Sequence, residues 1–259
     1  MQFIEFINLL KDCFMPIHLD QYQGEFGYVV NSDTELGRVG YTTNLDQITV
    51  AQAVEAKVDA VLTHHDAWDF LYELRTDVYN MLQANAISHC FIHLPLDAVD
   101  FGTAASLSER MGFTIQDVFA YVEKLPCGRI CECRPPLPLS IIASRLAGVT
   151  DDNVKVWVHN DSPVHCVGVT TGAGHMTHHI KEAADKGCDT YITGETSLYT
   201  VEYARYRGIN LLVGTHTHTE VLGLEGLCDR LKQHMNLEFI RLQEGRFESG
   251  NSINRATES

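Results

Sequence analysis

The chain alternates between helical and extended patterns of apolar residues over most of its length. Residues 2–13 place apolar side chains at helical spacing, and residues 50–57 are predicted to form a helix that leads into an apolar strand, 60–63. A further predicted helix, 72–84, precedes a second apolar strand, 89–92. Helices that alternate with buried strands are typical of a layered α/β fold.

A proline-rich stretch interrupts this alternation near the middle of the chain. Residues 127–138 contain three prolines and are predicted to be a linker. The linker marks the expected boundary between a first α/β lobe, residues 1–125, and a second, residues 126–259. Beyond it the alternation resumes, and the polar tail after Glu248 is expected to fray. The pattern therefore predicts two α/β lobes whose sheets are flanked by helices.

A weak internal repeat relates the two predicted lobes. Residues 53–65 and 183–195 each read as a helix, an aspartate turn and a buried strand that ends in threonine. The next strand in each half ends in a histidine with a carboxylate four positions later. These pairs are His93 with Asp97 in the first half, and His216 with Glu220 in the second. Two matches in the same order indicate duplicated lobes that face each other.

Histidines and carboxylates follow the predicted strands where each strand ends. Ligands gather outside the carboxyl ends of strands in α/β sheets, and imidazole with carboxylate suits zinc, iron, manganese or nickel. Adjacent histidines at a strand end point to opposite sides, so we expect His64 and His65 to contact different ions that Asp97 or Glu220 bridges. The predicted metal ligands are His64, His65, Asp97, His216 and Glu220.

Other polar motifs have simpler explanations. The chain has 13 histidines, so a single one is more often structural than a ligand. The turn with Gly172 and Gly174 could present backbone N–H groups to a phosphate, but it lacks the lysine of a P-loop, which favours a tight turn. Glu195 could shuttle protons or cap the next helix. Three further candidates, Cys127, Cys131 and Cys133, lack a fourth cysteine ligand and are predicted to be reduced thiols.

The charge and the cysteine content restrict the class of partner. A net charge of −15 argues against nucleic acid or an anionic membrane as the main partner, since both would be repelled. No apolar run approaches the roughly 20 residues that span a bilayer. The eight cysteines are scattered, which fits a reducing compartment, and we expect a cytoplasmic protein without a signal peptide.

Four passages together resemble a known family. Residues 59–65 end in the double histidine, 93–97 and 214–220 each place a carboxylate four positions after a histidine, and 189–195 end in Thr-Gly-Glu. The pattern resembles the Nif-three-like family of dinuclear metal proteins, labelled GTP cyclohydrolase I type 2 homologues. The likeness runs from the first helix to Phe239.

The resemblance implies two α/β lobes with the metal site between them, two divalent ions per chain, and assembly into a toroidal homohexamer. It maps the ligands onto the same five residues and leaves His93 as a further ligand or a neighbour of one. Two departures from the usual pattern are Asp66 after the double histidine and Thr215 before His216. Neither removes a ligand.

Two classes of function remain open at this stage. The first is a metal-dependent hydrolase acting on a small molecule such as a nucleotide or a phosphoester, with zinc, iron or manganese as the ion. Its proton-transfer groups would be Glu195 and His93, with Asp66 as a further candidate. The second is a non-catalytic metal-binding scaffold or regulatory protein in a ring-shaped oligomer. The ligand set alone does not separate the two.

Overall fold

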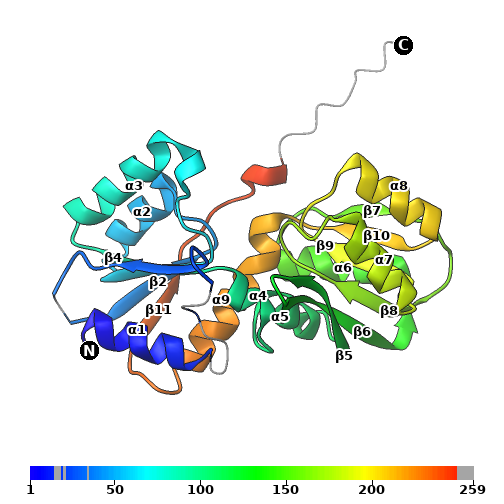
Figure 1. The fold of residues 1–259 in the computed structure, drawn as a ribbon, viewed down its shortest axis with the longest axis horizontal. Helices are drawn as coiled ribbons and strands as arrows, with labels where there is room; N and C mark the ends of the chain where they lie inside the picture. The colour runs from blue at the N-terminus through cyan, green and yellow to red at the C-terminus, as the bar shows by residue number, and fades with distance from the viewer. Residues whose placement is uncertain (15–18, 20–21, 34, 250–259) are drawn as a thin grey trace, which may run out of the picture.

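The computed structural model describes residues 1–14, 19, 22–33 and 35–249. These residues form two α/β lobes, each built on one sheet, with the helix α9 (His216–Leu231) lying between them (Figure 1). The predicted fold class is confirmed. The polar tail that the sequence predicts to fray lies outside the described residues beyond Ser249.

The first lobe holds a five-stranded sheet in the order β1-β4-β3-β2-β11. Four of the strands are parallel, and β1 runs antiparallel to β4 at one edge. The strands are β1 (Phe26–Val29), β2 (Arg38–Thr42), β3 (Ala60–Thr63), β4 (Ser88–Ile92) and β11 (Glu238–Arg241).

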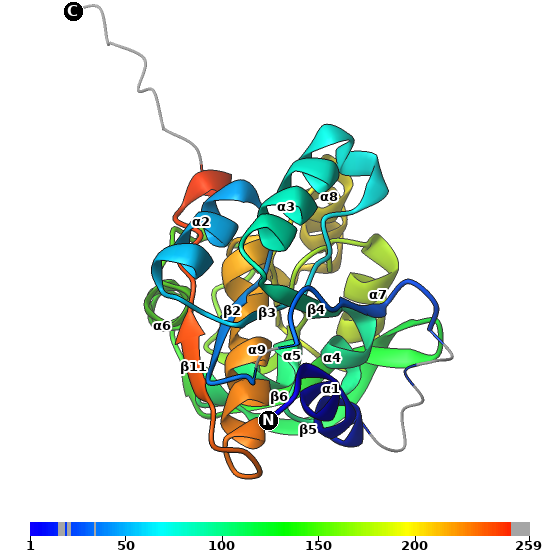
Figure 2. The ribbon, with the colours of Figure 1, turned by 90° about the vertical axis from the view of Figure 1, so that its left-hand side faces the viewer.

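Helices cover both faces of this sheet, as Figures 1 and 2 show. The helices α1 (Phe3–Asp12) and α9 pack on one face, and α2 (Gln47–Glu55) and α3 (Glu73–Ala84) pack on the other. Successive side chains of a strand point to opposite faces. Leu62 of β3 therefore joins the core with α1 and α9, whereas the adjacent Val61 joins the core with α2 and α3.

The second lobe holds a six-stranded mixed sheet in the order β5-β6-β8-β9-β10-β7. Its parallel centre is β8-β9-β10, and β5, β6 and β7 are joined by antiparallel pairing. The strands are β5 (Thr114–Val122), β6 (Leu125–Leu137), β7 (Lys155–Trp157), β8 (Val164–Val169), β9 (Thr190–Thr193) and β10 (Asn210–Val213).

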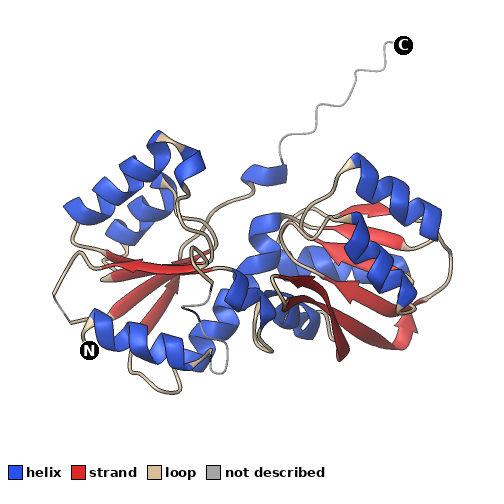
Figure 3. Ribbon diagram, viewed as in Figure 1, coloured by secondary structure: helices blue, strands red, loops and turns tan. Residues whose placement is uncertain are grey.

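This sheet is also covered on both faces (Figure 3). One core contains side chains from α5, α6 and α9, and the other contains side chains from α7 and α8. The helices are α5 (Thr103–Arg110), α6 (Leu139–Thr150), α7 (Thr177–Asp185) and α8 (Leu198–Arg207).

The predicted linker is wrong, because residues 127–138 lie almost entirely within the long strand β6. Pro135 and Pro136 of this segment fall where the register of β6 with β8 shifts, between Glu132 and Leu137. A strand tolerates proline where the ladder is interrupted, because no N–H is needed there.

The predicted boundary after residue 125 also does not coincide with the change of sheet. The strand β5 lies before residue 125 but pairs within the six-stranded sheet, and β11 lies after it but pairs with β2 in the five-stranded sheet. The chain therefore returns to the first lobe at its end, after α9.

The internal repeat corresponds to the same local structure in both lobes. Asp59 and Asp189 each accept two backbone N–H groups from the start of the neighbouring strand, which ties that strand to β3 or β9. The donors are Gly37 N at 2.7 Å and Arg38 N at 2.8 Å for the first, and His165 N at 2.8 Å and Cys166 N at 3.0 Å for the second. The repeated alanines each accept a bond at the end of their helix, from Val58 N to Ala53 O and from Cys188 N to Ala183 O.

The helix α9 joins the two lobes because it is buried along most of its length. Leu224 and Leu227 belong to the core of the first lobe, and Leu222 belongs to the core of the second. At Gly223 an added Cβ would lie 2.7 Å from the backbone nitrogen of Thr103, so only glycine allows α5 to approach this closely. The middle of α9 is thereby held at the junction of the lobes.

The described helices include none that is long and apolar enough to cross a membrane.

Candidate metal centre

Four histidine side chains from both lobes meet at the junction where α9 begins. His64 and His65 follow β3, and His93 follows β4, so these parallel strands bring all three to one edge of the first sheet. His216 is the first residue of α9, beyond the carboxyl end of β10. The ring centroids of neighbouring histidines lie 4.8 to 5.2 Å apart.

Two carboxylates, the buried Glu220 and the partly buried Asp97, complete this histidine cluster. Oε2 of Glu220 lies 3.2 Å from Nε2 of His65 and 3.1 Å from Nε2 of His216. Oε1 of Glu220 lies 3.7 Å from Nε2 of His64, and Oδ1 of Asp97 lies 3.4 Å from the same nitrogen. The two oxygens of Glu220 are therefore close to two different groups of imidazoles. Asp97 is held by α4 (Leu94–Ala98).

Each of the four histidines uses its Nδ1 atom in a hydrogen bond outside the cluster. The acceptors are oxygens, so each Nδ1 must carry the proton, and in the neutral ring Nε2 keeps a free lone pair. Nδ1 donates from His64 to Ile92 O at 2.9 Å, from His65 to Asn44 Oδ1 at 2.7 Å, from His93 to Glu25 Oε2 at 2.5 Å, and from His216 to Glu195 Oε1 at 2.6 Å. Four imidazoles are thus oriented with Nε2 available to a cation.

Two buried atoms at the centre lack a hydrogen-bond partner, Nε2 of His64 and Oε2 of Glu220. Leaving such an atom unpaired costs about 1–3 kcal/mol, and both atoms are electron-pair donors that a cation would satisfy. Three overlapping groups have ligand atoms within 4.8 Å of one another and could hold a metal ion. They are His64, His65 and His93; His65, His216 and Glu220; and His64, Asp97 and Glu220. Imidazole and carboxylate are a donor set suited to divalent transition metals.

The charges within the cluster shift the pKa values of its members. Burial acts to lower the pKa of His216, but Glu220 and Glu195 outweigh it and raise that pKa to about 11. Burial is likewise outweighed at His64, where Asp97 and Glu220 raise the pKa to about 9. Burial acts to raise the pKa of Glu220, yet the histidines hold it well below its ordinary value. The centre therefore stabilises positive charge, whether protons or a metal ion carry it.

A glycine turn from the second lobe closes over Glu220. Gly172 has a φ of +50°, and a Cβ there would lie 1.8 Å from Oε1 of Glu220 and 2.7 Å from Nε2 of His216. Gly172 N donates to Thr219 Oγ1 at 3.1 Å. A Cβ at Gly194, in the Thr-Gly-Glu sequence after β9, would lie 2.8 Å from the backbone of Gly172. Neighbouring atoms approach both positions so closely that only glycine fits there. This agrees with the predicted tight turn.

Glu195 lies beside the cluster rather than at a helix cap. Its Oε1 accepts from His216, as described above, and its Oε2 lies 3.2 Å from Nδ1 of His175. The helix cap is Ser197, whose hydroxyl accepts from Thr200 N at 3.2 Å. The alternative that Glu195 caps the next helix is therefore wrong.

Asp66 and Thr215, the two departures from the family pattern, bond to structural neighbours. Oδ1 of Asp66 accepts from Ala67 N at 2.8 Å and from the Tyr79 hydroxyl at 2.6 Å. Thr215 Oγ1 donates to Asp152 Oδ2 at 3.2 Å. Neither residue belongs to a group that could hold a metal ion among the described residues.

The cysteines of residues 127–133 are free thiols, as the sequence indicates. Cys131 and Cys133 belong to the core of the second lobe, and Cys131 Sγ donates to Ser108 Oγ at 3.3 Å. Burial raises the pKa of Cys131 to about 11, which keeps the thiol protonated near neutral pH. Within the described part of the chain, no metal-binding group includes a cysteine.

Sequence reasoning missed the residues that support the histidines from a distance. Glu25 precedes His93 by 68 positions, and no local pattern marks it. The amide of Asn44 is oriented by Glu244, which accepts from its Nδ2 at 2.7 Å and leaves Oδ1 toward His65. Glu248 accepts from His216 N at 2.7 Å and thereby caps α9. Glu244 and Glu248 lie in a polar segment that resembles any solvated tail in the sequence.

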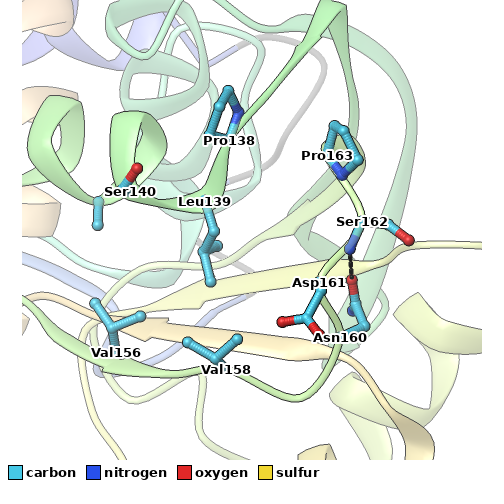
Figure 4. Close-up of a pocket in the computed structure, with 10 residues that line it drawn as sticks. Pro138, Leu139, Ser140, Val156, Val158, Asn160, Asp161, Ser162 and Pro163 are labelled. Atoms are coloured by element: carbon cyan, nitrogen blue, oxygen red, sulfur yellow. Dashed lines mark hydrogen bonds between the residues drawn. The ribbon is translucent and has the colours of Figure 1, made fainter.

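Two cavities adjoin the cluster and share His93, Ala173 and His216 among their lining residues. One has a volume of about 170 Å³ and extends past Asp97 and Cys127; the other, about 600 Å³, extends past His65 and Trp68. A third cavity of about 560 Å³ lies between the start of α6 and β7 (Figure 4) and shares no lining residue with either. Asp161 is the one charged residue among its described lining residues.

Comparisons with known proteins agree with this geometry. The sequence profile of the Duf34/NIF3 family (NGG1p interacting factor 3) matches residues 1–246. A protein of Escherichia coli K12 named GTP cyclohydrolase 1 type 2 homolog is 31% identical over 202 residues, covering 74% of this chain and 78% of its own. A Pasteurella multocida protein of the same name is 28% identical, covering 82% and 86%.

Solved structures show the same fold. A protein described as ybgI, of unknown function, has a TM-score of 0.82 at 25% identity, covering 94% of this chain and 99% of its own. Reduced HcgD from Methanocaldococcus jannaschii has a TM-score of 0.76 at 21% identity, covering 94% and 98%, and shows the fold alone. Taken with the profile match over nearly the whole chain, these likenesses establish that the protein belongs to the Duf34/NIF3 family.

Proposed function

We propose that this protein binds two divalent metal ions at the lobe junction and is a metal-dependent hydrolase. The observation that carries the proposal is the placement of Nε2 atoms around Glu220. Oε1 lies near His64, which also faces Asp97, and Oε2 lies near His65 and His216. Glu220 is therefore the proposed bridge between the ions, which are zinc, iron or manganese. The proposed ligands are His64, His65, Asp97, His216 and Glu220.

A pair of divalent ions lowers the pKa of bound water toward neutrality and stabilises negative charge on a phosphoryl or carbonyl oxygen. The protein supplies proton transfer. His93 lines both cavities beside the centre, and its Nδ1 is fixed by Glu25, so it is the proposed group that moves protons at Nε2. Glu195 lines the larger cavity and also orients His216, so it is proposed as a second such group and a positioning residue.

The proposal extends to the surroundings of the site. The substrate is a small molecule, a nucleotide or a phosphoester, and the protein acts in the cytoplasm as a toroidal homohexamer, as the family resemblance implies. Light scattering on the purified protein tests the assembly. The expected mass is about six times the 29.0 kDa of one chain.

The metal proposal is tested by titrating chelator-treated protein with Zn²⁺, Fe²⁺ or Mn²⁺ and measuring the bound metal by elemental analysis. Two ions per chain are expected for the unaltered protein. Glu220→Gln should reduce the number bound, because the bridge loses its charge, whereas His234→Ala is a matched control at an exposed histidine outside the cluster. One ion per chain at saturation would contradict the dinuclear site.

Hydrolysis is tested on the metal-loaded protein with a panel of nucleotides and phosphoesters. Turnover should disappear together with metal in Glu220→Gln. It should fall in His93→Gln while the metal content stays near two ions. Full metal loading without turnover across the panel would favour the alternative, a non-catalytic metal-binding scaffold.

A further inference from the structure

The larger cavity beside the metal centre has an aromatic wall. Trp68 packs edge-on against His93, with ring centroids 5.6 Å apart at 65°. Phe70 stacks on Trp68 at 6.4 Å and 17°, so the wall leads outward from the histidine cluster. Phe247, from the short helix η3 (Phe247–Ser249), lines the same cavity. This wall, Trp68, Phe70 and Phe247, belongs to none of the ligand groups described above.

Two rings of the wall are exposed. Phe70 is 69% exposed and Phe247 is 61% exposed. Neither packs in a core of the described residues, so folding does not explain their position. The cavity of about 600 Å³ falls within the range of small-molecule sites, roughly 300–1,000 Å³. A planar ligand on Trp68 would lie between Phe70 and His93.

Apart from the histidines of the cluster, the charged side chains that line this cavity are carboxylates. None of the described lining residues is lysine or arginine, whereas four are carboxylates: Asp46, Asp66, Glu195 and Glu248. Arg75 lies nearby, but its guanidinium is 3.2 Å from Asp69 and 3.6 Å from Asp66, outside the lining. Sites that bind several phosphates place arginine, lysine or clusters of N–H donors around them. This cavity lacks the cationic side chains that such a ligand needs.

We propose that the natural substrate carries a planar aromatic or heteroaromatic ring that binds on the aromatic wall, and no more than one negative charge. The proposal rests on the hydrolase function proposed above and narrows its substrate class. One charged or polar group of the substrate would face the metal centre, and the ring would extend over Trp68 toward Phe70. A nucleoside or an aryl phosphodiester fits this description. A nucleoside triphosphate fits less well, because the described lining residues include no lysine or arginine to pair with phosphates that lie beyond the metal centre.

The two tryptophans of the chain make this inference measurable. Trp157 lies in β7, so a Trp157→Phe protein keeps Trp68 as its single tryptophan. Guanosine, cyclic guanosine monophosphate, guanosine triphosphate and inorganic triphosphate are titrated against this full-length protein, both Zn²⁺-loaded and with chelator. Guanosine carries the ring without the charge, inorganic triphosphate carries the charge without the ring, and guanosine triphosphate carries both. The fluorescence of Trp68 reports ring binding, and calorimetry reports binding of any kind.

We expect guanosine and the cyclic monophosphate to quench Trp68 and to bind within about threefold of each other. Guanosine triphosphate should bind at least about tenfold more weakly, and inorganic triphosphate should not quench Trp68. Phe70→Ala should weaken guanosine binding about tenfold, within the range of base–aromatic stacking. Tyr206→Ala, at an aromatic residue of α8 that is 81% exposed, is the matched control and should leave binding unchanged.

Tighter binding of the triphosphate than of guanosine in both metal states would overturn the proposal. An unchanged guanosine affinity in Phe70→Ala would also overturn it. The same holds if the only effect of Phe70→Ala and Phe247→Ala is a change in the mass of the oligomer. The last result would assign the wall to contact with a second copy. Failure of the hydrolase proposal looks different: guanosine would bind with the expected dependence on Phe70, but no tested compound would turn over.

Discussion

Replacing Gly172 by alanine should strongly weaken metal binding without unfolding the protein. The new Cβ would lie 1.8 Å from Oε1 of Glu220, and real Cβ contacts essentially never fall below 3.0 Å. The contacted atoms, Oε1 of Glu220 and Nε2 of His216, lie at the ends of side chains, so both side chains can rotate away and Glu220 must move furthest. In doing so it leaves the position where its two oxygens face His64 on one side and His65 and His216 on the other.

The magnitude has two parts. Alanine in the left-handed region costs about 1–2 kcal/mol of folding stability, because Gly172 has a φ of +50°. Displacing the proposed bridging ligand should weaken metal binding by at least about 100-fold, the upper end of what loss of an outer hydrogen-bond partner costs. A 100-fold loss corresponds to about 2.7 kcal/mol. The metal-dependent part of the stability should fall by the same amount.

Gly208→Ala separates the two parts. Gly208 ends α8 with a φ of +65°, and a Cβ there would meet no atom within 4 Å. The control therefore has the backbone strain without the collision. Competition with a chromophoric chelator gives the metal affinity, and urea unfolding with and without Zn²⁺ gives the stability. If Gly172→Ala binds metal within about threefold of Gly208→Ala, the assignment of Glu220 to the metal centre is refuted.

Three further predictions concern the surroundings of the centre. Glu195→Gln should weaken metal binding about 10–100-fold in chelator competition, because Glu195 orients the ligand His216, whereas Glu25→Gln should lower turnover with the metal content near two ions, because Glu25 orients His93; an unchanged metal affinity in Glu195→Gln would exclude its role. Burial lowers the pKa of His89 to about 3, so the unfolded chain binds a proton below pH 6.5 and the folded chain does not. Stability should therefore fall as the pH drops, by about 2 kcal/mol at pH 5 from His89 alone, and in chelator His89→Gln should lose that part of the slope in urea unfolding. Leu227→Ala, in the first core, should destabilise by about 2–5 kcal/mol in the same assay, and a cost below about 1 kcal/mol would mean that α9 is not packed there.

Much of the fold follows from local sequence patterns because the central strands are short, buried and largely apolar. The predicted strands 60–63 and 89–92 correspond to β3 and β4 to within a residue, and the predicted helix 72–84 corresponds to α3. Local pattern failed where the chain departs from helix–strand alternation. Residues 127–138 contain prolines that normally end a strand, and only the interrupted pairing of β6 with β8 accommodates them.

The candidate site, too, could be predicted from the sequence only in part. Its ligand candidates could be found from sequence because they directly follow strands, and parallel strands place their carboxyl ends together. The residues that orient the histidines could not be found, since a hydrogen bond between Glu25 and His93 or between Glu244 and Asn44 leaves no periodic signal. Their partners are set by tertiary packing across 68 and 200 positions.

The internal repeat explains why the two lobes contribute differently to one centre. Asp59 and Asp189 have the same role in each copy, so the strand ends that follow them are equivalent in backbone structure. In the first lobe the equivalent positions carry His64 and His65. In the second lobe they include Gly194, because the turn at Gly172 lies 2.8 Å from where a Cβ would be. The turn at Gly172 also confines Glu220. The ligands on this side of the site come from α9 instead of from a strand end. The asymmetry of the site is thus a packing consequence of the glycine turn.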